Sequence, residues 1–134
     1  MTTSVYTNPG QVNIADTTIQ PGFVGGVQIQ IGLSTGGPYS VGTLQIPLTS
    51  WSVSAGAATL SWSAFVAATT AAGITFTDGI DYYCQAEVYS GTVIPIPTGD
   101  ISVGASPESA FVLTAPPPPP PPANPTNFSF GAAA

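Results

Sequence analysis

The chain has 134 residues, and its six charged side chains are all carboxylates, because lysine, arginine and histidine are absent. Without cationic side chains it cannot neutralise phosphates or anionic lipid headgroups, so the composition excludes nucleic acids and membrane surfaces as partners. The same absences exclude a histidine general base, a Schiff-base lysine and a histidine-containing metal site, so we expect no enzyme and no cofactor.

Residues 1–9 are polar and end in the turn signal Asn8-Pro9-Gly10, which predicts an exposed N-terminal arm. This segment lacks the basic and apolar regions of a secretory signal peptide. Either the sequence begins inside a processed chain, or the protein is made and assembled in the cytoplasm, as virion proteins are. No apolar run reaches the roughly 18 residues that a membrane helix needs.

Apolar and polar residues alternate in short segments along the rest of the chain, and this period of two predicts β-strands. Glycine and proline turns separate the segments at intervals of roughly ten residues, which is typical of an all-β sandwich or barrel. We therefore expect one β-domain over residues 10–115, with about seven to nine short strands. The candidate strand segments lie at residues 11–20, 27–33, 44–48 with a continuation at 51–53, 58–62, 74–76, 81–90, 93–96, 101–103 and 110–114.

Three segments allow finer predictions. Four aliphatic residues in 27–33 alternate with glutamine and glycine, which predicts a strand buried on one face only. These aliphatic residues are Val27, Ile29, Ile31 and Leu33. Pro47 indicates an edge strand or a bulge, because proline cannot donate to a sheet. Residues 64–72 have a helix-friendly composition, but two threonines and the following Gly73 limit the expected helix to a single turn.

The stretch Asp78-Gly79-Ile80-Asp81-Tyr82-Tyr83-Cys84 resembles the strand-F signature of immunoglobulin-like domains, in which a tyrosine stands two residues before a cysteine. Residues 110–114, followed by prolines, also resemble the last strand of a fibronectin type III domain. The resemblance implies a single antiparallel immunoglobulin-like sandwich, in which Tyr82 hydrogen-bonds backbone upstream and Cys84 points into the core. Cys84 is the only cysteine, so we expect a free thiol that packs as a small hydrophobic side chain.

Few side chains could carry other chemistry. Asp78 and Asp81 could either hold Ca²⁺ or cap backbone amides, and the Asp-Gly turn dipeptide favours capping, so we expect no metal. Aromatic residues could form a sugar-stacking face, but core and interface packing is the simpler explanation. Asn127-Phe128-Ser129 is an N-glycosylation sequon, so Asn127 is a candidate glycosylation site.

Seven consecutive prolines, Pro116–Pro122, can join neither a helix nor a sheet and predict a polyproline II rod roughly 22 Å long. We assign the rod to residues 116–123, which makes it an extended C-terminal arm of the β-domain. A rod of this kind holds whatever follows it at a distance from the domain.

The last segment, residues 124–134, predicts a docking tail. Thr126, Phe128 and Phe130 alternate there, which is the pattern of a short strand with one apolar face. Such a segment buries too little to fold alone, but in a neighbour's groove it gains main-chain hydrogen bonds and two aromatic anchors. The expected subunit-docking residues are Phe128 and Phe130 in the tail, and Pro116 and Pro122 at the ends of the rod.

Body, rod and tail together predict a structural protein. We expect a protomer of a self-assembling extracellular or cell-surface filament, pilus-like or another fibre, in which copies of this chain join head to tail. The N-terminal arm is the rival donor for this contact. The alternatives are a virus or phage tail or decoration subunit, located in the virion, and a monomeric carbohydrate-binding or adhesin module on a proline linker. Glycans are therefore a further candidate partner.

Overall fold

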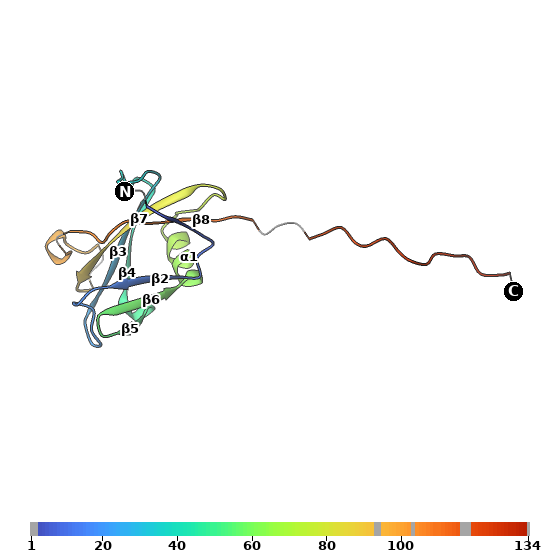
Figure 1. The fold of residues 1–134 in the computed structure, drawn as a ribbon. Coiled ribbons are helices and arrows are strands. Elements are labelled where there is room, and N and C mark those ends of the chain that lie inside the picture. The colour runs from blue at the N-terminus through green and yellow to red at the C-terminus, as the bar shows by residue number, and fades with distance from the viewer. Residues whose placement is uncertain (1–2, 93–94, 103, 116–118, 134) are drawn as a thin grey trace.

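The computed structural model describes residues 3–92, 95–102, 104–115 and 119–133. Within these residues the fold is mainly β, with eight strands in two sheets and one α-helix (Figure 1). The strands are β1 (Val5–Thr7), β2 (Gln11–Ala15), β3 (Gly25–Gly32), β4 (Gly42–Pro47), β5 (Ser52–Ser54), β6 (Ala57–Ser61), β7 (Asp81–Ser90) and β8 (Ser109–Val112). The helix α1 spans Trp62–Ala71, and two 3-10 helices span Leu48–Ser50 and Thr98–Asp100.

The larger sheet has the strand order β1-β8-β7-β3-β4, and the smaller has the order β2-β6-β5. β1 runs parallel to β8, with Tyr6 opposite Phe111, whereas the other strand pairs are antiparallel. The expectation of a purely antiparallel fold is therefore wrong at this edge. The exposed N-terminal arm expected over residues 1–9 contains a strand, β1, which pairs with β8. This short polar segment carries no alternation of its own, and only its contact with β8 makes it a strand.

Several strand predictions are confirmed. β7 has the expected bounds, and Pro47 ends β4, which is an edge strand of the larger sheet. The predicted strand at residues 74–76 is not formed, and within the segment 101–103 Ile101 makes only an isolated bridge to Tyr89. The predicted strands at 93–96 and 101–103 include Val93, Ile94 and Val103, which lie outside the described residues.

The helix α1 has ten residues, so the expected single turn is wrong. The Ser61 hydroxyl caps its first turn by accepting a hydrogen bond from the Ala64 N–H at 3.2 Å. At the other end Gly73 has a positive φ of 78°, and Ile74 donates its N–H to the Thr69 carbonyl at 2.8 Å. This C-terminal pattern is a Schellman motif, so both ends of the helix are satisfied despite its threonines.

The core contains side chains from both sheets and from α1, with Val27, Ile29 and Ile31 on the inner face of β3. Leu33 lies beyond β3 and is 54% exposed, so the predicted apolar face ends one position early. The opposite face of β3 is also covered, since Gln28 is buried and accepts a hydrogen bond from Gln45. The Gln45 side chain in turn accepts a hydrogen bond from the Ile96 N–H, which holds the segment after β7 against this face.

β7 is also covered along the edge that β8 leaves free. The Ser106 N–H donates to the Ala86 carbonyl at 2.8 Å, and the Ser106 hydroxyl accepts from the Ala86 N–H at 3.0 Å. Ser102 makes the same pair of contacts to Val88. Two serines therefore satisfy backbone groups that would otherwise form an open sheet edge.

A groove between two edge strands

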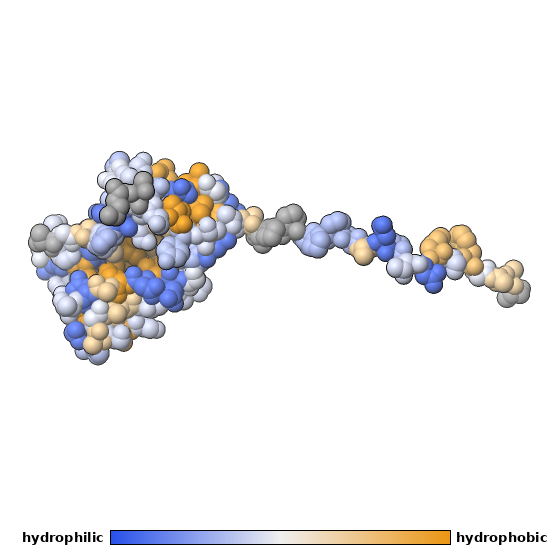
Figure 2. All heavy atoms as spheres, viewed as in Figure 1, coloured by the Kyte–Doolittle hydropathy of each residue, from blue (hydrophilic) through white to orange (hydrophobic). Residues whose placement is uncertain are grey.

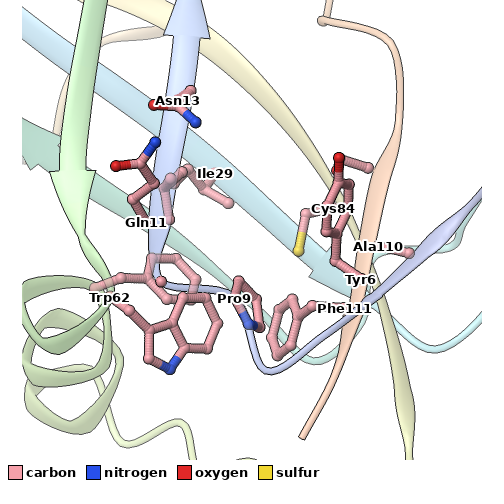
Figure 3. A pocket seen from close by; sticks show the side chains of 13 residues that line it. Tyr6, Pro9, Gln11, Asn13, Ile29, Trp62, Cys84, Ala110 and Phe111 are labelled. Carbon is pink, nitrogen blue, oxygen red and sulfur yellow. The ribbon is translucent and has the colours of Figure 1, made fainter.

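A groove of about 510 Å³ opens between β1 and β2, the edge strands of the larger and the smaller sheet (Figure 3). The chain passes directly from β1 to β2 through the predicted turn at Asn8-Pro9-Gly10, where Asn8 has a positive φ of 49°. These two strands part after the turn and join different sheets. The gap between them exposes hydrophobic atoms in a recess of the body (Figure 2).

The floor of the groove is the inner face of the larger sheet. Ile29 from β3, Cys84 from β7 and Phe111 from β8 lie there, and the side chain of Trp62 closes the end near α1 (Figure 3). Phe65 from α1 also lines the groove. None of the residues that line the groove is charged. The groove therefore suits an uncharged, apolar occupant, because a charged group would lose its hydration there without gaining a partner.

The wall formed by β2 has a free backbone edge. Just outside the two ends of β2, Trp62 donates its N–H to the Gly10 carbonyl at 3.1 Å, and Asp16 donates its N–H to the Gly56 carbonyl at 2.9 Å. Hydrogen-bonded residues alternate along an antiparallel strand, so the even-numbered residues of β2 direct their backbone groups toward β6. In the described part of the chain β2 pairs only with β6. The backbone N–H and C=O groups that consequently face the free edge belong to Gln11, Asn13 and Ala15.

An aromatic cluster holds the floor in place. Phe111 lies at its centre, with ring centroids 4.9 Å from Trp62, 5.0 Å from Phe76 and 5.4 Å from Tyr82. The Tyr82 hydroxyl accepts a hydrogen bond from the Thr77 N–H at 2.7 Å. This is an upstream backbone contact of the kind that the immunoglobulin-like resemblance implies for Tyr82.

Cys84 is a free thiol that is only partly buried, because its side chain borders the groove. Burial, reinforced by the nearby Glu108 carboxylate, raises the pKa of the Cys84 thiol to about 12. The thiol therefore stays protonated at neutral pH and behaves as an apolar surface of the groove.

Glu108, just before β8, ties the N-terminal segment to the loop after β3. Its carboxylate accepts hydrogen bonds from the Thr3 hydroxyl at 2.6 Å, the Tyr39 hydroxyl at 2.6 Å, the Thr35 hydroxyl at 2.8 Å and the Gly36 N–H at 2.8 Å. The bonds from Thr3 and Tyr39 contribute most to holding the pKa of Glu108 down at about 2. Burial, followed by the Glu108 carboxylate, raises the pKa of Tyr39 to about 12.

This role of Glu108 is not apparent in the sequence, although one general signal exists. In a chain without cations a carboxylate can pair only with hydroxyl and N–H groups, and a Thr-Gly-Gly loop supplies both. The groove residues Gln11, Asn13 and Tyr6 carry no such signal, since the groove depends on how two edge strands separate.

The predicted docking residues Phe128 and Phe130 lie in a segment, residues 119–133, that forms no helix or strand and is exposed throughout. Their side chains are 82% and 90% exposed, and hydrophobic atoms gather near the far end of this segment (Figure 2). Asn127 is exposed directly before Phe128, and Pro122 lies further upstream and is also exposed. Pro116, the expected start of the rod, lies outside the described residues.

The other candidate residues do not form sites in the described part of the chain. Asp78 and Asp81 are exposed, and no group of three metal-ligating side chains occurs among the described residues. Of the aromatic candidates, Trp51, Tyr82 and Tyr89 are buried, whereas Tyr6 and Trp62 line the groove. In the same residues no helix is long and apolar enough to cross a membrane.

Comparison of the chain with protein-family models, with curated proteins and with solved structures finds no match. Inferences about function therefore depend on the geometry of the groove and of the C-terminal segment.

Proposed function

We propose that this chain is a structural protomer of a self-assembling extracellular filament, pilus-like or another surface fibre, whose subunits join head to tail through a terminal arm. In this proposal the body is an immunoglobulin-like β-sandwich, residues 116–123 form a polyproline II rod, and residues 124–134 dock on a neighbouring subunit. The protein has no catalytic role and needs no cofactor. A head-to-tail contact that does not close on itself produces an open helical polymer.

The observation that carries the proposal is the exposure of Phe128 and Phe130 in a segment without charges. Burying each phenylalanine is worth roughly 1.5–3 kcal/mol. An isolated chain forgoes this energy at both positions, whereas a polymer recovers it at every interface. The uncharged groove beside β2 is a surface of matching chemistry on the same molecule.

A truncation tests the proposal. Removal of residues 116–134 is expected to leave a folded monomer, measured by circular dichroism and light scattering, whereas the full chain forms filaments visible by electron microscopy. A full-length Phe128→Ser, Phe130→Ser variant is the matched control, because it keeps the chain length and removes only the two anchors. Filaments of normal appearance from the truncated chain contradict docking by the tail.

Removal of residues 1–8 tests the rival donor at the N-terminus. In the structure Val5–Thr7 already pairs with β8, and Thr3 already donates to Glu108, so this segment is occupied within its own chain. We expect the deletion to destabilise the fold without selectively abolishing assembly.

A monodisperse full-length monomer contradicts the filament and favours the carbohydrate-binding module, which retention on a glycan column then tests. The position of these subunits in a virion rather than in a surface fibre is the remaining alternative. Electron microscopy of native material distinguishes the two, because a virion fibre is attached to a capsid.

A further inference from the structure

We propose that the groove between β1 and β2 receives residues 126–130 of a second copy of this chain, added as a strand along the free edge of β2. This inference rests on the proposed function and specifies the acceptor surface that the filament contact requires. The occupant is the tail of another protomer, and the acceptor is defined by Gln11, Asn13 and Ala15 on β2 together with the groove floor.

The backbone of β2 offers what an added strand needs. Three alternate positions, Gln11, Asn13 and Ala15, present N–H and C=O groups along the free edge, and the first two line the groove. An extended segment of five residues can satisfy these groups. The free edge of β7 is already covered by Ser102 and Ser106. The other edge of the smaller sheet, β5, has only three residues. Among the described edges, β2 combines a free backbone with an apolar groove that opens onto the core.

The side chains of the tail match this surface. In an extended strand Thr126, Phe128 and Phe130 share one face, and Asn127 and Ser129 share the other. Adding the strand to β2 turns the two phenylalanines toward the floor formed by Ile29, Cys84 and Phe111, and leaves the polar pair in solvent. Neither partner carries a charge at this contact, so no carboxylate is buried.

The length of the rod indicates a second copy rather than the chain's own groove. Seven prolines in polyproline II span roughly 22 Å away from the body. A tail at the end of a stiff rod is held away from its own body, so we take a groove on a neighbouring molecule as the acceptor.

Cys84 provides a direct test, because the only thiol of the chain borders the groove. A full-length Phe128→Cys variant carries one thiol in the tail and one at the acceptor. Oxidation by oxygen with a copper–phenanthroline catalyst at pH 9 joins the two thiols, and oxygen takes up their hydrogens as water. Because every chain then carries both partners, docking is expected to give a ladder of covalent oligomers on a non-reducing gel.

Matched variants define the register. Phe128→Cys or Phe130→Cys is expected to form the ladder at least about tenfold more efficiently than Asn127→Cys or Ser129→Cys, because alternate residues face opposite sides. In a Cys84→Ser background the same tail variants can form only dimers. Dimers alone in the presence of Cys84, or equal ladders from all four tail positions, overturn the proposal.

A second test does not depend on thiol reactivity. Asn13→Pro removes one N–H from the free edge of β2, and Asn13→Ala is its control. Both variants lose the hydrogen bond that the Asn13 side chain accepts from Thr59, but only the proline variant loses the backbone donor. We expect the proline variant to raise the critical concentration for assembly about tenfold over the alanine variant. Equal critical concentrations overturn docking along β2.

Failure of this inference is distinguishable from failure of the proposed function. If filaments form without the covalent ladder, and assemble equally well with Asn13→Pro and with Asn13→Ala, the filament proposal stands and docking in the groove is rejected. A full-length wild-type chain that stays monomeric at all concentrations rejects the filament itself.

Discussion

Four hydrogen-bond donors from two other parts of the chain converge on the Glu108 carboxylate. In a chain without lysine, arginine or histidine, a carboxylate can still organise its surroundings in this way, because hydroxyl and N–H donors stabilise its charged form. The result is that β1, which forms one wall of the groove, is held at its N-terminal end by Thr3. Glu108 therefore positions the groove without lining it.

The lowered pKa of Glu108 predicts an acid-sensitive fold. Its pKa is about 2 in the folded chain, held there chiefly by Thr3 and Tyr39, against about 4.3 for an ordinary glutamate. The stability that it contributes is therefore present above pH about 4.3 and is lost as the pH falls toward about 2. Glu108→Gln is expected to lower the melting temperature by several degrees at pH 7 and to flatten this acid dependence, measured by circular dichroism.

Glu87→Gln is the control for this prediction, because it removes the same charge from a carboxylate on β7. We expect Glu87→Gln to retain the acid dependence of the wild type. A Glu108→Gln variant whose melting temperature follows the wild type from pH 7 to pH 2 contradicts the role assigned to the Glu108 carboxylate.

Tyr82 makes a second prediction at the scale of a residue. Tyr82→Phe removes the hydrogen bond from the Thr77 N–H and keeps the ring that stacks on Phe111. Thr77 is exposed, so water can replace the hydroxyl, and the expected loss is about 0.5–1.5 kcal/mol in the free energy of unfolding. Urea titration measures it. Tyr83→Phe on the adjacent position is expected to change stability less, and equal losses from both variants contradict a specific role for the Tyr82 hydroxyl.

At the scale of secondary-structure elements, α1 shapes one end of the groove through Trp62 and Phe65. Ser61→Ala removes the hydroxyl that caps this helix and is expected to cost about 0.5–2 kcal/mol in the free energy of unfolding. Ser52→Ala, at an exposed position of β5, is the control and is expected to be close to neutral. Urea titration compares the two, and a neutral Ser61→Ala shows that tertiary packing alone fixes the start of α1.

Strands that alternate strongly were predictable, and elements fixed by their surroundings were not. β7 carries its own period of two and was predicted with its bounds, whereas β1 depends on β8 and Glu108 for its place in the sheet. The helix was underestimated because the threonines in residues 64–72 lower its intrinsic propensity. Thr69 is nevertheless buried with its hydroxyl bonded to the Val66 carbonyl, which removes the cost of a polar group in the core.

The candidate docking contact was predictable on one side only. The tail carries its signal in a few consecutive residues, Thr126 to Phe130, because alternation and exposure are local properties. The groove depends on side chains from five strands and a helix, together with the separation of β1 from β2. No pattern in the sequence of residues 5–15 predicts that these two strands join different sheets.

At the scale of the whole molecule, the formal net charge of −6 has no internal compensation, since no cationic side chain is present. Protomers in a polymer therefore repel one another at long range, while the proposed contact between tail and groove is uncharged. Attraction and repulsion then depend differently on salt. Salt screens the repulsion, and it leaves the burial of Phe128 and Phe130 essentially unchanged.

This difference predicts that salt promotes assembly. Raising NaCl from 0.01 M to 0.15 M shortens the screening length from about 30 Å to about 8 Å, so the critical concentration measured by light scattering is expected to fall several-fold. Asp81→Asn combined with Glu87→Gln removes two of the six charges at positions away from the groove and should weaken this dependence. A critical concentration that rises with salt contradicts the prediction, because such a rise requires an interface held by opposite charges. This chain has no cationic side chain, so its N-terminal amine is the one positive group that it could contribute.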